Sequence, residues 1–494
     1  MPMRVLLWLW LAGWLCLCAG PLAAQDVVAT LELSRKEPRP LWFEYVKADS
    51  GLVTLSYMSR NSSRYIGIYK YDAAFQRQWS HQFIENDQRK DIIYLGVLGN
   101  HIYIFVAEAP RGAETTDVYL YAYDLEGKLV AERVPAATLS EKQKPREVLG
   151  FVKAINKRRL YVVQQLPATK ADKTLKVRCL MFAQGQGPSF VADTTVLPYP
   201  ATQLSIKQME VANTGELYLL TKKFEDAREK TTAFAMFRIL PQAPAESKLL
   251  ETPLYYPENQ ITDLIFKLDP QGTVYLGGFY SKRTADKAHG LIYTRLTATD
   301  NTMEATSFVP FNKEFLAKYL TRRQLSRDQA LTDFYLDHII LRSDGGLLLL
   351  AEQYWVSSMA YTDAYGFISY REFYNYDDIA AFSISPDGEL EWTAVIPKQQ
   401  TGEYKPELSY FHAVSPTGIQ FYYKARSKAS GSNVFAREIS YDGQVSPVRI
   451  FLQGLRSGDT FYRKACEQVT NSRALIVFAK ARQRTFTMLK VALE

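Results

Sequence analysis

The chain has 494 residues, of which 47% are hydrophobic and 13% aromatic, enough apolar material for a large folded core. Its formal net charge of +7 comes from Lys and Arg residues that alternate with Asp and Glu along the whole chain. Because a nucleic-acid partner requires basic residues clustered in a stripe, we predict that this protein binds no nucleic acid. Its four cysteines are too few for a scaffold held together by disulfides.

The first 24 residues have the three parts of a secretory signal peptide. A basic start at Arg4 is followed by an apolar run over residues 5–19 and by small residues at Ala23 and Ala24. The run is shorter than the roughly 20 residues that span a bilayer as a helix, and no later stretch is apolar enough to span one. We therefore expect cleavage before Gln25, no transmembrane segment, and export to the periplasm, the cell surface or the medium.

The mature chain shows a repeated cycle of four strands. Gly after Asp, Asn or Ser supplies the positive φ that tight hairpins need, and runs of alternating apolar residues lie between such turns. The first cycle is predicted at Trp42 to Lys47, Gly51 to Met58, Arg64 to Tyr71 and Gln76 to Phe83. Later cycles begin near Asp91, Glu147, Leu204, Ile261, Phe334, Leu408 and Phe461. A spacing of roughly 45 to 75 residues is typical of a blade array.

The two ends of the mature chain complete one cycle. The last cycle has only three strands, ending with Thr485 to Leu493, while Val27 to Leu33 is a spare strand before the first cycle. Pairing these two strands would close the array and remove its exposed edges. We therefore predict an all-β chain with a single domain over residues 25–494. This domain is an eight-bladed β-propeller closed by its N- and C-terminal strands, with seven blades as the alternative.

One segment breaks the β pattern. Residues 312–330 are predicted to form an inserted helix between the fifth and sixth cycles, with Asn312 as its N-cap. Its apolar stripe comprises Phe315, Leu316, Tyr319 and Leu320. We expect this helix to pack over the end of a blade.

The turn between the third and fourth strands carries a recurring signature. It stands at Tyr123-Asp124-Leu125-Glu126-Gly127, at residues 385–392 (Ser-Pro-Asp-Gly-Glu-Leu-Glu-Trp) and at Tyr441-Asp442-Gly443. These turns resemble those of WD40-like and PQQ-like propellers, and the stretch from Asp377 to Lys398 is similar to a group of uncharacterised exported bacterial β-propeller proteins. The resemblance implies the fold and carries no known activity. Most cycles lack the closing Trp, and no residues suited to a quinone are present, so we predict no cofactor.

No local catalytic signature is present. The chain has no Gly-x-Ser-x-Gly elbow and no glycine-rich phosphate loop. Its five histidines are scattered without the spacing of a zinc site, so we predict no bound metal. His338 and His412, on predicted inner strands, are expected to be packed in the core. Cys179 and Cys466 lie in different cycles and are expected to be buried free thiols.

The connections between strands differ in length between the two rims of the predicted ring. In an antiparallel sheet the connections alternate between rims, and the longer ones are predicted all to lie on one side. Long loops on a rigid scaffold usually carry recognition. The richest element is a predicted inserted loop over residues 356–376. Together with its flanks it supplies the candidate binding residues Tyr354, Trp355, Tyr361, Tyr365, Phe367, Tyr370, Phe373, Tyr374, Tyr376, Asp377 and Asp378.

Aromatic rings provide large contact areas, and tyrosines add a polar tip, so this set suits a protein or a glycan partner. The alternative is that the rings form a local core that plugs the mouth of the channel. We predict an exported, non-catalytic binding or scaffolding propeller. The alternative function is a carbohydrate-active or other hydrolytic enzyme in which acids such as Asp377 and Asp378 converge near the channel. Two buried carboxyl groups with raised pKa that face each other would favour the enzyme.

Overall fold

The computed structural model describes the chain except for fourteen segments. These are residues 1–26, 34–39, 61–62, 86–89, 141–142, 225–231, 283–286, 328–329, 363–366, 404–407, 428–430, 456–458, 481–484 and 494. The predicted signal peptide and Tyr365 lie outside the described residues.

The described residues form eight antiparallel sheets, numbered here in chain order. Sheet 1 contains β2 (Pro40–Val46), β3 (Gly51–Arg60), β4 (Ser63–Tyr71) and β5 (Arg77–Glu85). Sheet 2 contains β6 (Lys90–Leu98), β7 (His101–Glu108), β8 (Thr115–Asp124) and β9 (Leu129–Ser140). Sheet 3 contains β10 (Leu149–Lys153), β11 (Arg159–Leu166), β12 (Thr174–Ala183) and β13 (Val191–Pro200). Sheet 4 contains β14 (Leu204–Val211), β15 (Leu217–Phe224), β16 (Thr232–Ile239) and β17 (Leu249–Leu254).

The second half of the chain continues the pattern. Sheet 5 contains β18 (Gln260–Leu268), β19 (Val274–Ser281), β20 (Gly290–Leu296) and β21 (Met303–Pro310). Sheet 6 contains β22 (Phe334–Leu341), β23 (Leu347–Thr362), β24 (Ile368–Ile384), β25 (Leu390–Ile396) and the short β26 (Gln400–Gly402). Sheet 7 contains β27 (Tyr410–Val414), β28 (Gly418–Ser427), β29 (Gly431–Ser440) and β30 (Arg449–Leu455). Sheet 8 contains β31 (Thr460–Phe461), β32 (Glu467–Thr470), β33 (Arg473–Lys480), β34 (Thr485–Ala492) and β1 (Val27–Leu33).

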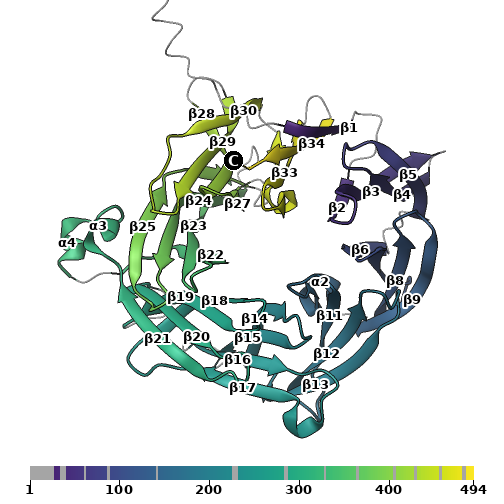
Figure 1. Cartoon of the computed structure of the whole chain (residues 1–494), viewed down its shortest axis with the longest axis horizontal. Coiled ribbons are helices and arrows are strands. Elements are labelled where there is room, and N and C mark those ends of the chain that lie inside the picture. The colour runs from purple at the N-terminus through teal and green to yellow at the C-terminus, as the bar shows by residue number, and fades with distance from the viewer. Residues whose placement is uncertain are drawn as a thin grey trace, which may run out of the picture.

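The sheets follow one another around a common centre, which is an arrangement of the β-propeller type (Figure 1). The first strands of the sheets, such as β6 and β22, lie nearest the centre, and the fourth strands, such as β9, β17 and β21, lie on the outside. The prediction of an all-β chain made of four-stranded units is confirmed. The strand starts agree with the predicted cycles, because alternating apolar residues bounded by turn residues define strands locally.

Sheet 8 joins the two ends of the chain. β1 pairs with β34 antiparallel, from Val27 opposite Val491 to Leu33 opposite Phe486. The strand order is therefore β1-β34-β33-β31, with the N-terminal strand on the outer edge. Leu31 and Leu33 are buried by this pairing.

Neighbouring sheets are held together by apolar clusters that both sheets contribute to. Sheets 1 and 2 share one cluster, and the same holds for each following pair through sheets 6 and 7. A further cluster includes Tyr422 from sheet 7, Val477 from sheet 8 and Leu52 from sheet 1. Burial of apolar area between sheets is thus the main stabilising contribution, as expected for a chain with few cysteines.

A repeated contact links the outer strand of one sheet to a turn of the next. The indole Nε1 of Trp79 on β5 donates to the carbonyl of Leu125 (2.9 Å), and that of Trp392 on β25 donates to the carbonyl of Tyr441 (3.1 Å). Gly443 in the second of these turns has φ +85°. A Cβ at Gly443 would lie 2.7 Å from the Trp392 ring, so this turn requires glycine for both its backbone and its close packing.

Two predictions about the connections are wrong. Residues 312–330 form two single-turn helices, α3 (Lys313–Leu316) and α4 (Arg322–Leu325), rather than one helix. Asn312 caps α3 as predicted, but Thr321 forms a capping box with Gln324 and so starts a second helix. The rims also differ less than predicted, because the connection from β16 to β17, with the 3-10 helix η1 (Ala245–Ser247), is long and lies on the other rim.

Two further short helices complete the described elements, α2 (Pro145–Val148) before β10 and the 3-10 helix η3 (Arg463–Ala465) before β32. Cys179 and Cys466 are buried free thiols, which confirms that prediction. Burial raises the pKa of both thiols to about 12, so neither is a reactive thiolate. Across the described parts of the chain, no helix combines the length and apolar character needed to cross a membrane.

Candidate functional site

The predicted aromatic loop is a long β-hairpin. β23 and β24 continue beyond the rest of sheet 6, and their pairing runs to Thr362 opposite Ile368. β22 pairs with β23 only as far as Gln353, and β25 pairs with β24 only from Ile379 onward. We call residues 354–362 and 367–376 the long hairpin. The prediction of a loop is wrong because this segment is rich in β-branched and aromatic residues and has no Pro, which favours strands.

The register of the long hairpin distributes its side chains over two faces. Directly opposite residues share a face, and successive residues alternate. One face carries Tyr354, Val356, Ile368, Tyr370, Tyr374 and Tyr376, and the other carries Trp355, Met359, Tyr361, Arg371 and Phe373. The first face is therefore mostly apolar or aromatic, whereas the second also carries Ser357, Ser369, Arg371 and Asn375.

Most of the exposed apolar residues lie toward the tip, and Val356 lies nearer the base, opposite Tyr374. Val356, Met359 and Ile368 are 46%, 55% and 63% exposed, and Phe367 and Tyr370 are 73% and 72% exposed. Large apolar side chains exposed together in this way commonly mark an interaction surface.

The aromatic residues near the base are engaged within the protein. The rings of Tyr354 and Tyr376 lie 4.7 Å apart between centroids. Nearer the tip, the guanidinium of Arg371 lies 4.6 Å from the centre of the Tyr361 ring. Tyr374 donates its hydroxyl to Glu372 (3.0 Å). The predicted residues therefore divide into a base that supports the hairpin and a tip that presents apolar surface.

The third strand of the base, β26, pairs with β24 at Tyr374 to Tyr376. Asn375 connects all three strands, because its Nδ2 donates to Ser357 Oγ (3.0 Å) and its Oδ1 accepts from Thr401 Oγ1 (2.9 Å). Asn375 is buried, so these bonds are shielded from water and hold the hairpin in a defined direction.

A buried ion pair lies beneath the base, and sequence reasoning did not find it. Lys398 Nζ lies 2.6 Å from Glu352 Oε1, and the side chains are 0% and 6% exposed. Lys398 also donates to the carbonyl of Tyr376 (2.9 Å) and to Gln400 Oε1 (2.9 Å), while Ser409 donates to Glu352. Burial lowers the pKa of Lys398 and raises the pKa of Glu352, and their mutual attraction opposes both changes.

Asp377 and Asp378 anchor neighbouring segments. Asp377 Oδ1 accepts from the backbone N–H of Gln400 (3.3 Å). Asp378 accepts from the backbone N–H of Lys398 (3.2 Å) and from the hydroxyl of Tyr319 (3.1 Å), beside α3. The two residues lie at a register shift in the pairing of β23 with β24, where both oppose Gln353, and both carboxylates accept from the segment that carries Lys398 and Gln400. Burial, and to a smaller extent the charge of Asp378, raises the pKa of Asp377, while the backbone N–H of Gln400 and the charge of Lys398 oppose this change.

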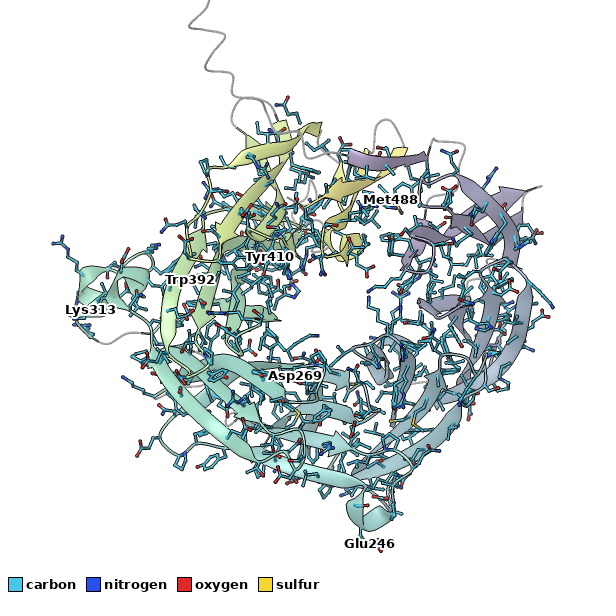
Figure 2. All side chains as sticks on the ribbon, in the orientation of Figure 1. Glu246, Asp269, Lys313, Trp392, Tyr410 and Met488 are labelled. Carbon is cyan, nitrogen blue, oxygen red and sulfur yellow. The ribbon has the colours of Figure 1, made fainter. Side chains whose placement is uncertain are left out.

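Two histidines lie on the inner strands, close to the central axis. The rings of His338 on β22 and His412 on β27 have centroids 4.3 Å apart, and Tyr410 beside them is fully buried. Figure 2 shows Tyr410 at the inner side of the sheets. The prediction that both histidines are packed core residues is wrong for His338, whose side chain is 42% exposed, whereas His412 is partly buried beside it. Among the described residues, no group of three His, Cys, Asp or Glu side chains is placed to hold a metal ion.

We expect this histidine pair to make the stability pH-dependent. Burial, and then the charge of His338, lowers the pKa of His412 from 6.5 to about 3. Below pH 6.5 the unfolded chain binds a proton that the folded chain does not, so the free energy of unfolding should fall by about 2 kcal/mol between pH 7 and pH 5. His412→Phe should flatten this part of the profile, measured by urea unfolding at each pH. A parallel decline in the variant would contradict the assignment.

The sequence matches no known family model and no curated protein. Similar solved structures include the polysaccharide lyase Uly1, at 10% identity over 81% of this chain and 89% of that one, with a TM-score of 0.41. An oligogalacturonate lyase in complex with manganese shows 9% identity over 94% and 99%, with a TM-score of 0.35. The β-propeller domain of the trilobed protease from Pyrococcus furiosus shows 9% identity over 82% and 96%, with a TM-score of 0.33. At these scores the similarities assign neither an activity nor a ligand to this chain.

Proposed function

We propose that this protein is an exported, closed eight-bladed β-propeller that binds a protein partner through the tip of the long hairpin and has no catalytic activity of its own. The observation that carries this proposal is the set of exposed apolar side chains on the long hairpin: Met359, Phe367, Ile368 and Tyr370 toward the tip, and Val356 nearer the base. The rigid base beneath it means that little ordering entropy is lost when a partner binds.

A closed ring is supported by the contacts between sheets 8 and 1. Lys490 on β34 is buried and donates its Nζ to the carbonyls of Ser50 and Ala73, both at 2.9 Å. The same ammonium lies 4.9 Å from the centre of the Phe75 ring. Together with the cluster shared by sheets 7, 8 and 1, these contacts join the last blade to the first. Export is proposed from the signal-like residues 1–24, with cleavage before Gln25.

A protein partner fits the tip better than a glycan does. Three exposed residues of the long hairpin, Val356, Met359 and Ile368, have non-aromatic apolar side chains, whereas glycans are usually held by polar groups beside flat rings. Within the described residues, β23 beyond Gln353 and β24 from Ile368 to Phe373 have no further strand on their outer edges. Unpaired strand edges offer backbone groups to a partner strand.

A hydrolytic function is not assigned to Asp377 and Asp378. Both carboxylates hold segments of the base, and Glu352 is neutralised by Lys398. Their role in this proposal is to position the hairpin.

The test is a hairpin variant that keeps the strands but removes the apolar tip, Met359→Ser/Phe367→Ser/Ile368→Ser/Tyr370→Ser. Partners captured from the native envelope by the full chain are identified, purified and titrated against both proteins. We expect the variant to bind the purified partner at least about 100-fold more weakly, because a buried interface core supplies most of the affinity. N-terminal sequencing of the native protein tests export in the same preparation and should begin at Gln25.

The matched control changes exposed apolar residues outside the hairpin, Val191→Ser/Val196→Ser/Tyr255→Ser, which are 44%, 49% and 65% exposed. This control should bind as the unchanged protein does. Equal loss in both variants would show a non-specific apolar effect, and unchanged affinity in the hairpin variant would overturn the proposal. If the unchanged protein binds a purified glycan and the hairpin variant does not, the partner is a glycan and the proposal of a protein partner is wrong.

A further inference from the structure

A second concave site lies between sheets 2 and 3, away from the long hairpin. It is an open pocket of about 380 Å³ lined by the polar side chains of Asp117, Thr138, Gln164 and Arg178 and by apolar residues that include Ala136 and Leu166. Asp117 lies near the start of β8, opposite Thr138 near the end of β9, and Gln164 lies near the end of β11. The pocket therefore opens on the same rim as the long hairpin, and its volume is in the range of small-molecule sites.

Gln164 presents an acceptor without a donor. Its side chain is 2% exposed, and its Nε2 donates to the carbonyl of Thr138 (3.2 Å). The opposite amide orientation would place two oxygens against each other, so the assignment of Oε1 is fixed by this bond. Within the described chain, Oε1 has no hydrogen-bond partner. A buried acceptor in this state is costly unless a bound molecule supplies a donor.

Arg178 presents donors without an acceptor. It lies directly opposite Gln164 in the pairing of β11 with β12, so both side chains point to the same face of sheet 3. No residue in the described ranges forms a hydrogen bond or an ion pair with its guanidinium, whereas the nearby Arg133 and Arg146 are paired with Glu108 and Asp91. A guanidinium in a pocket matches a carboxylate through two parallel hydrogen bonds.

Asp117 provides acceptors on the opposite wall. Its Oδ1 accepts from Thr138 Oγ1 (2.8 Å) and its Oδ2 accepts from the Tyr119 hydroxyl (3.4 Å), and each carboxylate oxygen can accept a further hydrogen bond. A ligand that satisfies this site needs one anionic group for Arg178 and hydroxyl donors for both Gln164 and Asp117. A hydroxyl group has only one hydrogen to donate, so Gln164 and Asp117 require at least two hydroxyl groups.

We propose that this pocket binds a uronate, a sugar ring that carries one carboxylate and several hydroxyl groups. The carboxylate pairs with Arg178 on the sheet 3 side, away from the negative charge of Asp117. Hydroxyl groups of the sugar donate to Gln164 Oε1 and to Asp117. The C–H groups of the sugar ring pack against apolar lining residues such as Ala136 and Leu166. This site is independent of the protein-binding function proposed for the long hairpin.

The experiment measures binding of D-glucuronate to the full chain by isothermal titration calorimetry. D-glucose lacks the carboxylate, and lactate has the carboxylate but a single hydroxyl. We expect D-glucuronate to bind at least about tenfold more tightly than either, and Arg178→Gln to weaken it by at least about tenfold, since hydrogen bonds to a charged group contribute about 1.5–3 kcal/mol. The matched control is Arg322→Gln on α4, which removes the same charge from an exposed position and should leave binding unchanged.

A second variant, Gln164→Met, removes the acceptor while keeping the volume, and its folding is checked by circular dichroism. It should also weaken D-glucuronate without changing the weak affinity for lactate. Three results would overturn the proposal: no binding of D-glucuronate by the folded protein at 50 mM, equal binding of lactate, or equal binding by Arg178→Gln.

Discussion

Lys398→Met is expected to reduce the free energy of unfolding by about 3–5 kcal/mol at pH 8. The substitution keeps the volume but leaves the Glu352 carboxylate buried without its partner, at 6% exposure. It also removes the donor to the carbonyl of Tyr376, so the base of the long hairpin should exchange its amide hydrogens faster. Urea unfolding and hydrogen exchange measure the two effects.

The pH dependence of this loss distinguishes an unpaired charge from a packing defect. Burial already raises the pKa of Glu352, and without Lys398 it should rise further. The folded variant therefore keeps a proton that the unfolded chain releases above pH 4.5, so its stability should decline as the pH rises from 5 to 8. The double variant Glu352→Gln/Lys398→Met should recover most of the loss. Lys144→Met, which breaks the exposed pair with Glu147, should cost less than about 1 kcal/mol.

The strands were predictable because their signals are local. Alternating apolar residues and turns such as residues 385–389 define each cycle without knowledge of distant partners. Gly388 has the predicted positive φ (+82°), and its N–H donates to the carbonyl of Ser385 (2.9 Å). The pairing of β1 with β34 could also be inferred, because a cycle lacking one strand and a spare strand at the other end complement each other.

The predictions of a loop over residues 356–376 and of a single helix over residues 312–330 were wrong for local reasons. Aromatic density between Trp355 and Tyr376 was interpreted as a loop because no neighbouring strand was predicted for it, although two strands can pair with each other beyond their sheet. The helix was interrupted at Thr321, whose capping box with Gln324 competes with continuation from α3.

The ion pair and the pocket could not be predicted because their residues are far apart in the sequence. Glu352 and Lys398 come from β23 and the segment after β25, and each alone resembles an ordinary surface charge. Asp117, Gln164 and Arg178 come from β8, β11 and β12 of two sheets. Gln164 Oε1 lacks a hydrogen-bond partner within the described residues. Such a lack is visible only in the folded structure, because no spacing motif in the sequence encodes it.

The contact between sheets 8 and 1 decides whether the ring is closed, as we propose. The proposed binding surface of the long hairpin keeps a fixed position only if these two sheets stay in contact. The clusters between sheets 1 and 7 are formed within a continuous stretch of chain, whereas the cluster around β1 requires the two ends to meet. We therefore expect substitutions in this cluster to lower the stability of sheets 7, 8 and 1 together.

Leu31→Ala/Leu33→Ala is expected to reduce the free energy of unfolding by about 4 kcal/mol or more. Each substitution removes buried methyl groups from the cluster shared by sheets 7, 8 and 1. Val27→Ala/Val28→Ala changes exposed residues of the same strand, at 48% and 45% exposure, and should cost less than about 0.5 kcal/mol for each substitution.

Hydrogen exchange separates a closed ring from an open array in the same variants. If the ring is closed, loss of Leu31 and Leu33 should weaken amide protection in β34 and also in sheets 1 and 7, whose residues Leu52 and Tyr422 share the cluster. In an open array only the amides of β34 would lose protection, because sheet 8 would not pack against sheet 1. Unchanged protection around Leu52 would therefore refute closure while leaving the four-stranded sheets themselves intact.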